Sequence, residues 1–101
     1  MITMSTREII NPATEDVLAE TPDAGPSEVN RAVAAAKKAF KSGVWSGKSP
    51  AERSTLMLKW ANLVEENLQR LAALESANTG KPIKLARDGD IPFAIDTLRF
   101  F

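Results

Sequence analysis

The sequence has 101 residues, enough for one small domain at most, and it contains neither cysteine nor histidine. Those absences exclude a disulfide framework, a zinc site with thiolate or imidazole ligands, and any reaction in which this stretch supplies a cysteine nucleophile or a histidine base. The 13 basic and 13 acidic residues cancel, which argues against nucleic acid as a partner, because phosphate binding needs a basic surface.

The composition is typical of a globular protein that does not enter a membrane. No apolar run approaches the roughly 20 residues that a spanning helix needs. The N-terminal stretch 1–8 lacks the basic start and long apolar centre of a signal peptide. A chain without cysteine is also compatible with a reducing compartment. We therefore expect a soluble, cytoplasmic protein without a membrane partner.

The first elements are two short extended segments, predicted at Thr6–Ile10 and Asp16–Thr21. Between them, Asn11 can bond its own backbone and Pro12 fixes φ, so the sequence predicts a turn and hence a β-hairpin. Two strands alone are marginal in water, so the hairpin must pack on something else. We interpret Pro22–Ser27, with its two prolines and a glycine, as a linker.

Two helices are predicted next. Apolar residues recur at helical spacing from Val29 to Phe40, and Ser42-Gly43 provides a stop because glycine accepts the left-handed cap conformation. The stretch Ser49-Pro50-Ala51-Glu52 is typical of a capping box with proline at the first helical position, and it predicts a second helix that ends near Glu66.

A third helix is predicted to begin at Asn67 as its cap and to end at Gly80-Lys81-Pro82, where glycine follows the stop and proline forbids continuation. A last helix is expected to begin near Asp90. Its apolar pattern still runs at Phe101, so we expect this helix to be interrupted there rather than finished.

Three local patterns could carry chemistry, and each has a simpler interpretation. Asp88 and Asp90 could form an acid–base pair, but a helix start that complements the dipole is favoured. Gly80–Pro82 lacks the full phosphate-loop pattern, so a helix C-cap is favoured. Trp45 and Trp60 could stack a ring ligand, but core packing is favoured. From the residues alone we expect a small, mostly helical module with a hairpin and no catalytic constellation.

Segments spread along the chain, taken in order, resemble the N-terminal part of the aldehyde dehydrogenase superfamily. The similar segments are Ile10-Asn11-Pro12-Ala13-Thr14, Val29-Asn30-Arg31-Ala32-Val33, Arg53 to Leu58, Asn78-Thr79-Gly80-Lys81-Pro82, and Asp90 with Leu98-Arg99-Phe100-Phe101. Each motif is weak alone, and their order and spacing make the resemblance specific. It runs from about Glu8 to Phe101 and is greatest to the amino- or betaine-aldehyde branch.

The resemblance implies an α/β parent with a Rossmann-like cofactor-binding domain, of which residues 1–101 are an incomplete N-terminal part. This part is a β-hairpin followed by about four helices that pack on the sheet. The parent oxidises an aldehyde to a carboxylic acid with NAD or NADP, and it forms a homodimer or homotetramer. Its catalytic Cys and general-base Glu, the Asn that helps hold the oxyanion, and the residues that bind NAD(P) lie beyond this chain, so 1–101 alone is expected to be inactive. The alternative is a truncated, non-catalytic helical interaction module derived from that family.

The resemblance also implies a partial site for Na⁺ or K⁺. Many family members hold such an ion with two main-chain carbonyls before the Asn-Pro and a carboxylate from a later helix, and the matching positions here are Ile9, Ile10 and Asp90. Oxygen ligands suit these hard cations, and carbonyls need no particular side chain. The alternative is that Asp90 only caps its helix while Ile9 and Ile10 make ordinary strand bonds.

Overall fold

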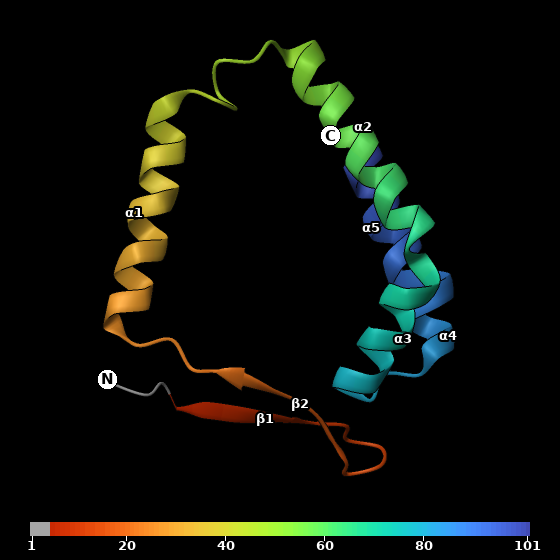
Figure 1. Cartoon of the computed structure of the whole chain (residues 1–101). Coiled ribbons are helices and arrows are strands. Elements are labelled where there is room, and N and C mark those ends of the chain that lie inside the picture. Colours follow the sequence, from red (N-terminus) through yellow and green to blue (C-terminus); the bar gives the residue numbers. More distant parts are fainter. Residues whose placement is uncertain (1–4) are drawn as a thin grey trace.

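The computed structural model describes residues 5–101, so residues 1–4 of the N-terminal stretch weighed for a signal peptide lie outside it. It contains a β-hairpin followed by helices, as predicted (Figure 1). The elements in chain order are β1 (Thr6–Ile10), β2 (Val17–Pro22), α1 (Pro26–Ser42), α2 (Pro50–Glu66), α3 (Leu68–Thr79), α4 (Ile83–Leu85), a π-helical turn η1 (Ala86–Asp90), and α5 (Ile91–Phe100).

The hairpin is antiparallel and closes through the predicted turn. The Asn11 side-chain oxygen accepts a hydrogen bond from the Ala13 N–H at 2.9 Å, the local bond that makes asparagine a turn residue. Opposite residues run from Thr6 with Pro22 to Ile9 with Ala19, and a β-bulge shifts the register so that Ile10 faces Val17. A bulge interrupts the hydrogen-bond ladder and increases the local twist.

Helix α1 is longer than the periodic pattern indicated. It begins at Pro26, because proline suits the first turn and the Gly25 N–H donates to the Glu28 carboxylate at 2.9 Å. The prediction of a linker over Pro22–Ser27 is therefore wrong at both ends, where β2 finishes and α1 starts. At the other end Gly43 adopts φ 72° and closes the helix as predicted.

The capping box of α2 is confirmed, and Asn67 stands at the predicted N-cap position of α3 but lacks the side-chain bond of a cap. The Ser49 N–H donates to the Glu52 carboxylate at 2.7 Å, and the Ser49 hydroxyl accepts from the Glu52 N–H at 3.2 Å. Asn67 makes no side-chain bond to α3. Its side-chain N–H instead donates to the Leu63 carbonyl at 2.8 Å, at the end of α2, where that carbonyl also accepts from the Asn67 backbone N–H at 3.2 Å.

The last helix begins earlier than expected. The backbone is already helical from Ile83, and α4, η1 and α5 continue one into the next, so residues 26–100 hold about four helical stretches. Asp90 has helical φ and ψ and makes no side-chain capping bond. The expectation that Asp90 only caps this helix is wrong, because no helix start with free N–H groups exists there.

A small core lies among α2, α3, η1 and α5, and its fully enclosed residues are mostly alanines. The buried side chains among the described residues are Ala61, Ala72, Ala86 and Ile95. Helices α2 and α5 lie side by side (Figure 1), and the Arg99 guanidinium joins them by donating to the Glu65 carboxylate at 2.6 Å. Small residues let these backbones approach closely, but they bury little apolar area.

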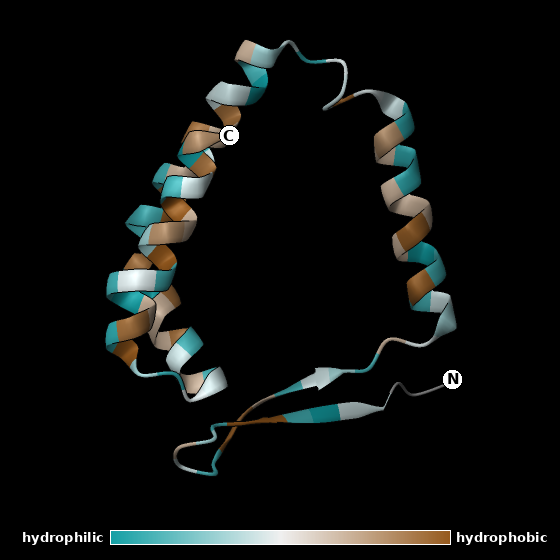
Figure 2. Cartoon of the chain, turned by 180° about the vertical axis from the view of Figure 1, so that it is seen from behind, coloured by the Kyte–Doolittle hydropathy of each residue, from teal (hydrophilic) through white to brown (hydrophobic). Residues whose placement is uncertain are grey.

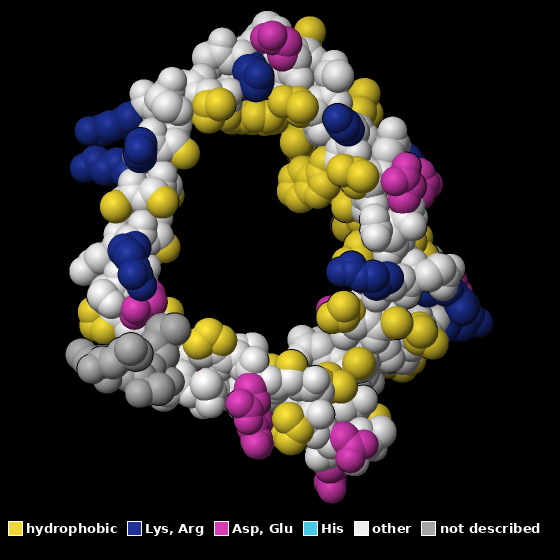
Figure 3. Space-filling model, viewed as in Figure 1, with side chains coloured by type: hydrophobic (Ala, Val, Ile, Leu, Met, Phe, Trp, Pro, Cys, Tyr) yellow, Lys and Arg dark blue, Asp and Glu magenta, His cyan; other side chains and the backbone are white. Residues whose placement is uncertain are grey.

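The chain is open rather than compact. Its radius of gyration is 17.9 Å and its extents are 47 × 45 × 15 Å, whereas a compact chain of 100 residues has a radius of about 13 Å. Helix α1 stands apart from the α2–α5 package, and the space-filling view has an opening between them, with hydrophobic side chains along much of its rim (Figures 1 and 3).

Large apolar side chains are exposed along α1, α2, α3, α4 and α5. Figure 2 marks the hydrophobic residues of these helices in brown. Trp45 and Trp60 are 47% and 55% exposed. The prediction that both tryptophans fill a core is therefore wrong for residues 5–101 taken alone, because the elements that could cover them are not among these residues. Among the same residues, no helix is both long enough and apolar enough to cross a membrane.

Candidate functional site

The hairpin turn lies against the end of α3. Gly80 ends this helix with φ 76°, a conformation that favours glycine, and its N–H donates to the Ser76 carbonyl at 2.9 Å. A Cβ at residue 80 would lie 2.7 Å from Cγ of Pro12. The missing side chain therefore allows the Asn11-Pro12 turn to approach the helix. We call this junction, formed by Pro12, Gly80, Lys81 and Asp90, the hairpin–helix corner.

An ion pair occupies the corner. The Lys81 ammonium donates to Oδ2 of Asp90, nine residues further along the chain. The hydrogen bond to Asp90 and the negative charge of Asp90 raise the pKa of Lys81, and the charge of Glu75 adds to the effect. The Lys81 and Asp90 side chains are 36% and 52% exposed, so solvent and salt screen the pair.

Asp88 does not share this corner. Its carboxylate accepts from the Arg87 guanidinium at 2.7 and 2.9 Å, and this bond lowers the pKa of Asp88. Each of the two carboxylates thus has its own cationic partner. The lowered pKa of Asp88 is the opposite of what a general acid needs near neutral pH, and Asp90 is already ion-paired with Lys81, so the acid–base pair is not supported.

The two isoleucines of the predicted cation site lie at the end of β1 that leads into the turn. Ile9 is half-buried and Ile10 is 42% exposed. The bulge falls between them, so the hydrogen-bond ladder is irregular where the two carbonyls stand. The contact of Pro12 with residue 80 brings this end of β1 near Lys81, the partner of Asp90. Convergence of both carbonyls and the Asp90 carboxylate on one point stays a prediction.

Asp90 also borders a pocket of about 300 Å³ on the helical side of the corner. The lining residues are Val64, Leu71, Glu75, Asp90, Ile91 and Ala94. Its walls are apolar apart from two carboxylates, so it combines negative charge with a surface that an apolar group could cover. The sequence pattern does not indicate Lys81 and Glu75 as parts of this site, because Gly80–Pro82 predicts only a helix end.

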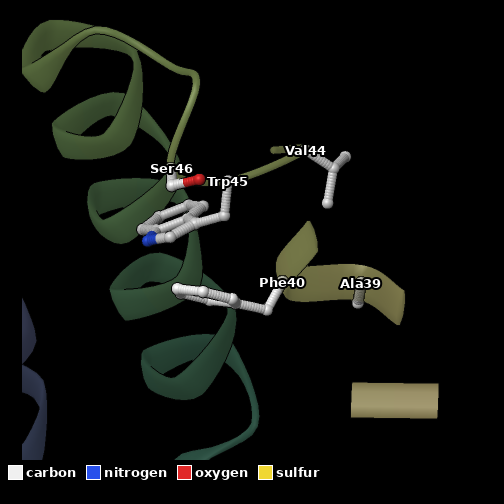
Figure 4. Close-up of a pocket in the computed structure, with 5 residues that line it drawn as sticks. All are labelled: Ala39, Phe40, Val44, Trp45 and Ser46. Atoms are coloured by element: carbon white, nitrogen blue, oxygen red, sulfur yellow. The ribbon is translucent and has the colours of Figure 1, made fainter. Parts of the chain in front are cut away.

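A second pocket, of about 170 Å³, lies where α1 gives way to the loop before α2. Its lining residues are Ala39, Phe40, Val44, Trp45 and Ser46. The rings of Phe40 and Trp45 extend to the same side (Figure 4). The pocket contains no charged group and no acid, base or nucleophile suited to catalysis, so it is suited to packing rather than to chemistry.

Within residues 5–101 no three carboxylate, histidine or cysteine side chains gather where they could hold a metal ion. The whole chain also lacks the cysteine and histidine on which covalent and acid–base catalysis most often depend. Among the described residues, the hairpin–helix corner therefore offers no reaction centre.

Comparison with known proteins confirms the resemblance. The pattern of the aldehyde dehydrogenase family matches residues 2–101. Aminoacetaldehyde dehydrogenase of Pseudomonas aeruginosa is 43% identical over 90 residues, which cover 89% of this chain and 18% of that relative.

Two solved structures agree with the fold. Gamma-glutamyl-gamma-aminobutyraldehyde dehydrogenase from Burkholderia cenocepacia superposes with a TM-score of 0.91 at 40% identity, over 94% of this chain and 19% of that one. The NAD⁺ complex of an aldehyde dehydrogenase from Bacillus cereus gives 0.89 at 44% identity, over 95% and 20% of the two chains. The chain thus spans about a fifth of the length of these relatives, and its hairpin and helices have the arrangement found in them. The chain belongs to the aldehyde dehydrogenase family.

Proposed function

We propose that these residues are the N-terminal part of the cofactor-binding domain of an NAD(P)⁺-dependent aldehyde dehydrogenase that oxidises an aldehyde to a carboxylic acid. The observation that carries the proposal is the family match over residues 2–101 together with a superposition at TM-score 0.91. Both extend over nearly the whole chain, so the match is not confined to one motif.

The role of these residues in that enzyme is structural. They contain no cysteine to attack a carbonyl and no histidine. In the proposed enzyme the catalytic Cys, the general-base Glu and the oxyanion-binding Asn belong to other parts of the chain. The open shape and the exposed apolar side chains support this structural role, because they suit a segment that packs against other parts of the enzyme.

The proposed cofactor is NAD or NADP, which would accept the hydride from the substrate. An NAD⁺ complex among the similar structures supports the nicotinamide class. The proposal assigns no residue of this chain to the cofactor. It also includes a cytoplasmic location and a homodimer or homotetramer, in keeping with the absence of cysteine and the extent of uncovered apolar surface.

We also propose that the hairpin–helix corner supplies part of a Na⁺ or K⁺ site, with the carbonyls of Ile9 and Ile10 and the carboxylate of Asp90. Three observations fit this donor set: the bulge disturbs the strand bonds between the two isoleucines, Lys81 uses only Oδ2 of Asp90, and the turn approaches residue 80. The ion would link the hairpin to the helices, and further oxygen ligands would come from other parts of the enzyme.

The uncovered apolar surface also fits the alternative of a non-catalytic helical module that binds a partner protein. Spectrophotometry of NAD(P)H formation separates the two. A chain of the relatives' length that contains these residues should form NAD(P)H when an aldehyde is added, whereas residues 1–101 alone should not. A chain of that length that binds a partner protein but turns over no aldehyde would favour the module.

A further inference from the structure

The position of Lys81 follows from the backbone around it. Gly80 adopts φ 76° and turns the chain out of α3. The Lys81 N–H then donates to the Thr79 hydroxyl at 3.2 Å, and that hydroxyl donates to the Glu75 carbonyl at 2.7 Å. These bonds fix the start of the lysine side chain, and its ammonium reaches Asp90 at the end of η1. The ion pair is thus a consequence of how α3 ends.

The charges around this ammonium do not cancel. Two carboxylates, those of Glu75 and Asp90, border the same pocket, and the ammonium of Lys81 is bonded to one of them, that of Asp90. The one ammonium and the two carboxylates together carry one net negative charge. A monovalent cation would neutralise it, whereas a divalent one would leave an excess of positive charge.

We propose that Lys81 and a monovalent cation share the Asp90 carboxylate, so that Lys81 sets how tightly the corner binds the ion. Lys81 keeps Oδ2, and the ion takes Oδ1 together with main-chain carbonyls of the hairpin. The Lys81 ammonium neutralises Asp90 while no ion is bound. When an ion binds, the ammonium lowers its affinity by like-charge repulsion. The inference rests on the proposed Na⁺ or K⁺ site, and Lys81 acts in it as a positioning residue rather than a ligand.

The size of the effect follows from the exposure of the pair. Two unit charges about 4 Å apart in a water-like medium repel by an amount equivalent to about a fivefold change in affinity. Lys81→Met should therefore lower the half-saturating concentration of Na⁺ or K⁺ about fivefold. Lys81→Arg keeps the charge and should leave it near the wild-type value. Glu75→Gln removes a negative charge and should raise it.

The experiment uses a protein that contains these residues and has the full length of the relatives. The melting temperature is measured while NaCl or KCl replaces choline chloride at constant ionic strength, and the half-saturating concentration is read for each variant. Asp90→Asn should abolish the response. Lys84→Met is the matched control, because it removes a lysine from the neighbouring helical turn, and the Lys84 charge acts on Asp88. Lys84→Met should respond like the wild type.

Each outcome supports or overturns either the shared carboxylate or the ion site itself. If Lys81→Met leaves the half-saturating concentration unchanged while Asp90→Asn abolishes the response, the ion site stands but Lys81 does not set its affinity. That result overturns the proposal that Lys81 and the ion share the carboxylate. No difference between Na⁺, K⁺ and choline in wild type or Lys81→Met overturns both. If Lys81→Met does not fold, Glu75→Gln still tests the charge argument, and an unchanged value there overturns it. NAD(P)H formation, measured separately, shows whether the proposed enzyme function fails instead.

Discussion

Replacing Gly80 with alanine tests the contact between the hairpin and the helices. The residue has φ 76°, so alanine incurs about 1–2 kcal/mol for the left-handed conformation. Its new Cβ would also lie 2.7 Å from Cγ of Pro12, an overlap that forces either the turn or the helix end to move. Overpacking of this kind costs about 1–3 kcal/mol. We expect a total loss of about 2–5 kcal/mol in the free energy of unfolding.

Gly43→Ala is the matched control. Gly43 has φ 72° at the end of α1, and a Cβ there would meet nothing within 4 Å. The control therefore carries only the backbone cost, about 1–2 kcal/mol. The difference between the two variants isolates the overlap at the hairpin–helix corner.

Pro12→Ala completes the cycle. It removes the Cγ that causes the overlap and keeps the Cβ of residue 12. A Cβ at residue 80 would lie 3.5 Å from that Cβ, which is an ordinary van der Waals distance. In the Pro12→Ala background, Gly80→Ala should cost no more than Gly43→Ala. The assay is the urea midpoint of the chain at the relatives' full length, at unchanged m-value. Equal losses of stability for Gly80→Ala and Gly43→Ala, or an unchanged loss for Gly80→Ala in the Pro12→Ala background, would show that residue 80 and Pro12 are not in close contact.

Three further predictions concern the helices. Residues 1–101 alone should unfold without a sharp transition and should bind a hydrophobic dye, because few large side chains are buried. A cooperative, reversible melt of the monomer would contradict this. Ser49→Ala should cost about 1 kcal/mol, read from the urea midpoint of the full-length chain. The bond from the Ser49 N–H lowers the pKa of Glu52. The stabilisation that this bond gives is therefore fully present above the pKa that Glu52 has in the unfolded chain. It is lost as the pH falls through the lower pKa that Glu52 has in the folded chain. Glu52→Gln should flatten that acid limb in melts recorded against pH, and an unchanged limb would count against the capping box.

The parts of the fold that depend on neighbouring residues could be predicted from the sequence. The Ser49–Glu52 box and the glycines at 43 and 80 act within a few positions, so the sequence alone indicated them and the structure confirms them. Asn67 shows the limit of local patterns. Its side chain can serve either of two adjacent helix ends, and only the geometry of the junction decides between them.

The features that sequence reasoning missed depend on longer-range contacts. The bond from Lys81 to Asp90 spans a helix end, a proline and a π-helical turn, and no periodic pattern indicates such a turn. The exposure of Trp45 and Trp60 has a different origin. Apolar side chains predict burial, but burial requires covering structure, which residues 5–101 do not provide.

The proposed enzyme function is tested most directly by aldehyde-dependent formation of NAD(P)H, measured for two purified proteins. One protein has the full length of the relatives and contains these residues at its start, and the other consists of residues 1–101 alone. We expect turnover by the first protein and none by the second, because residues 1–101 contain no cysteine nucleophile. Turnover by residues 1–101, or its absence from a folded full-length chain over a panel of aldehydes with both NAD⁺ and NADP⁺, would contradict it.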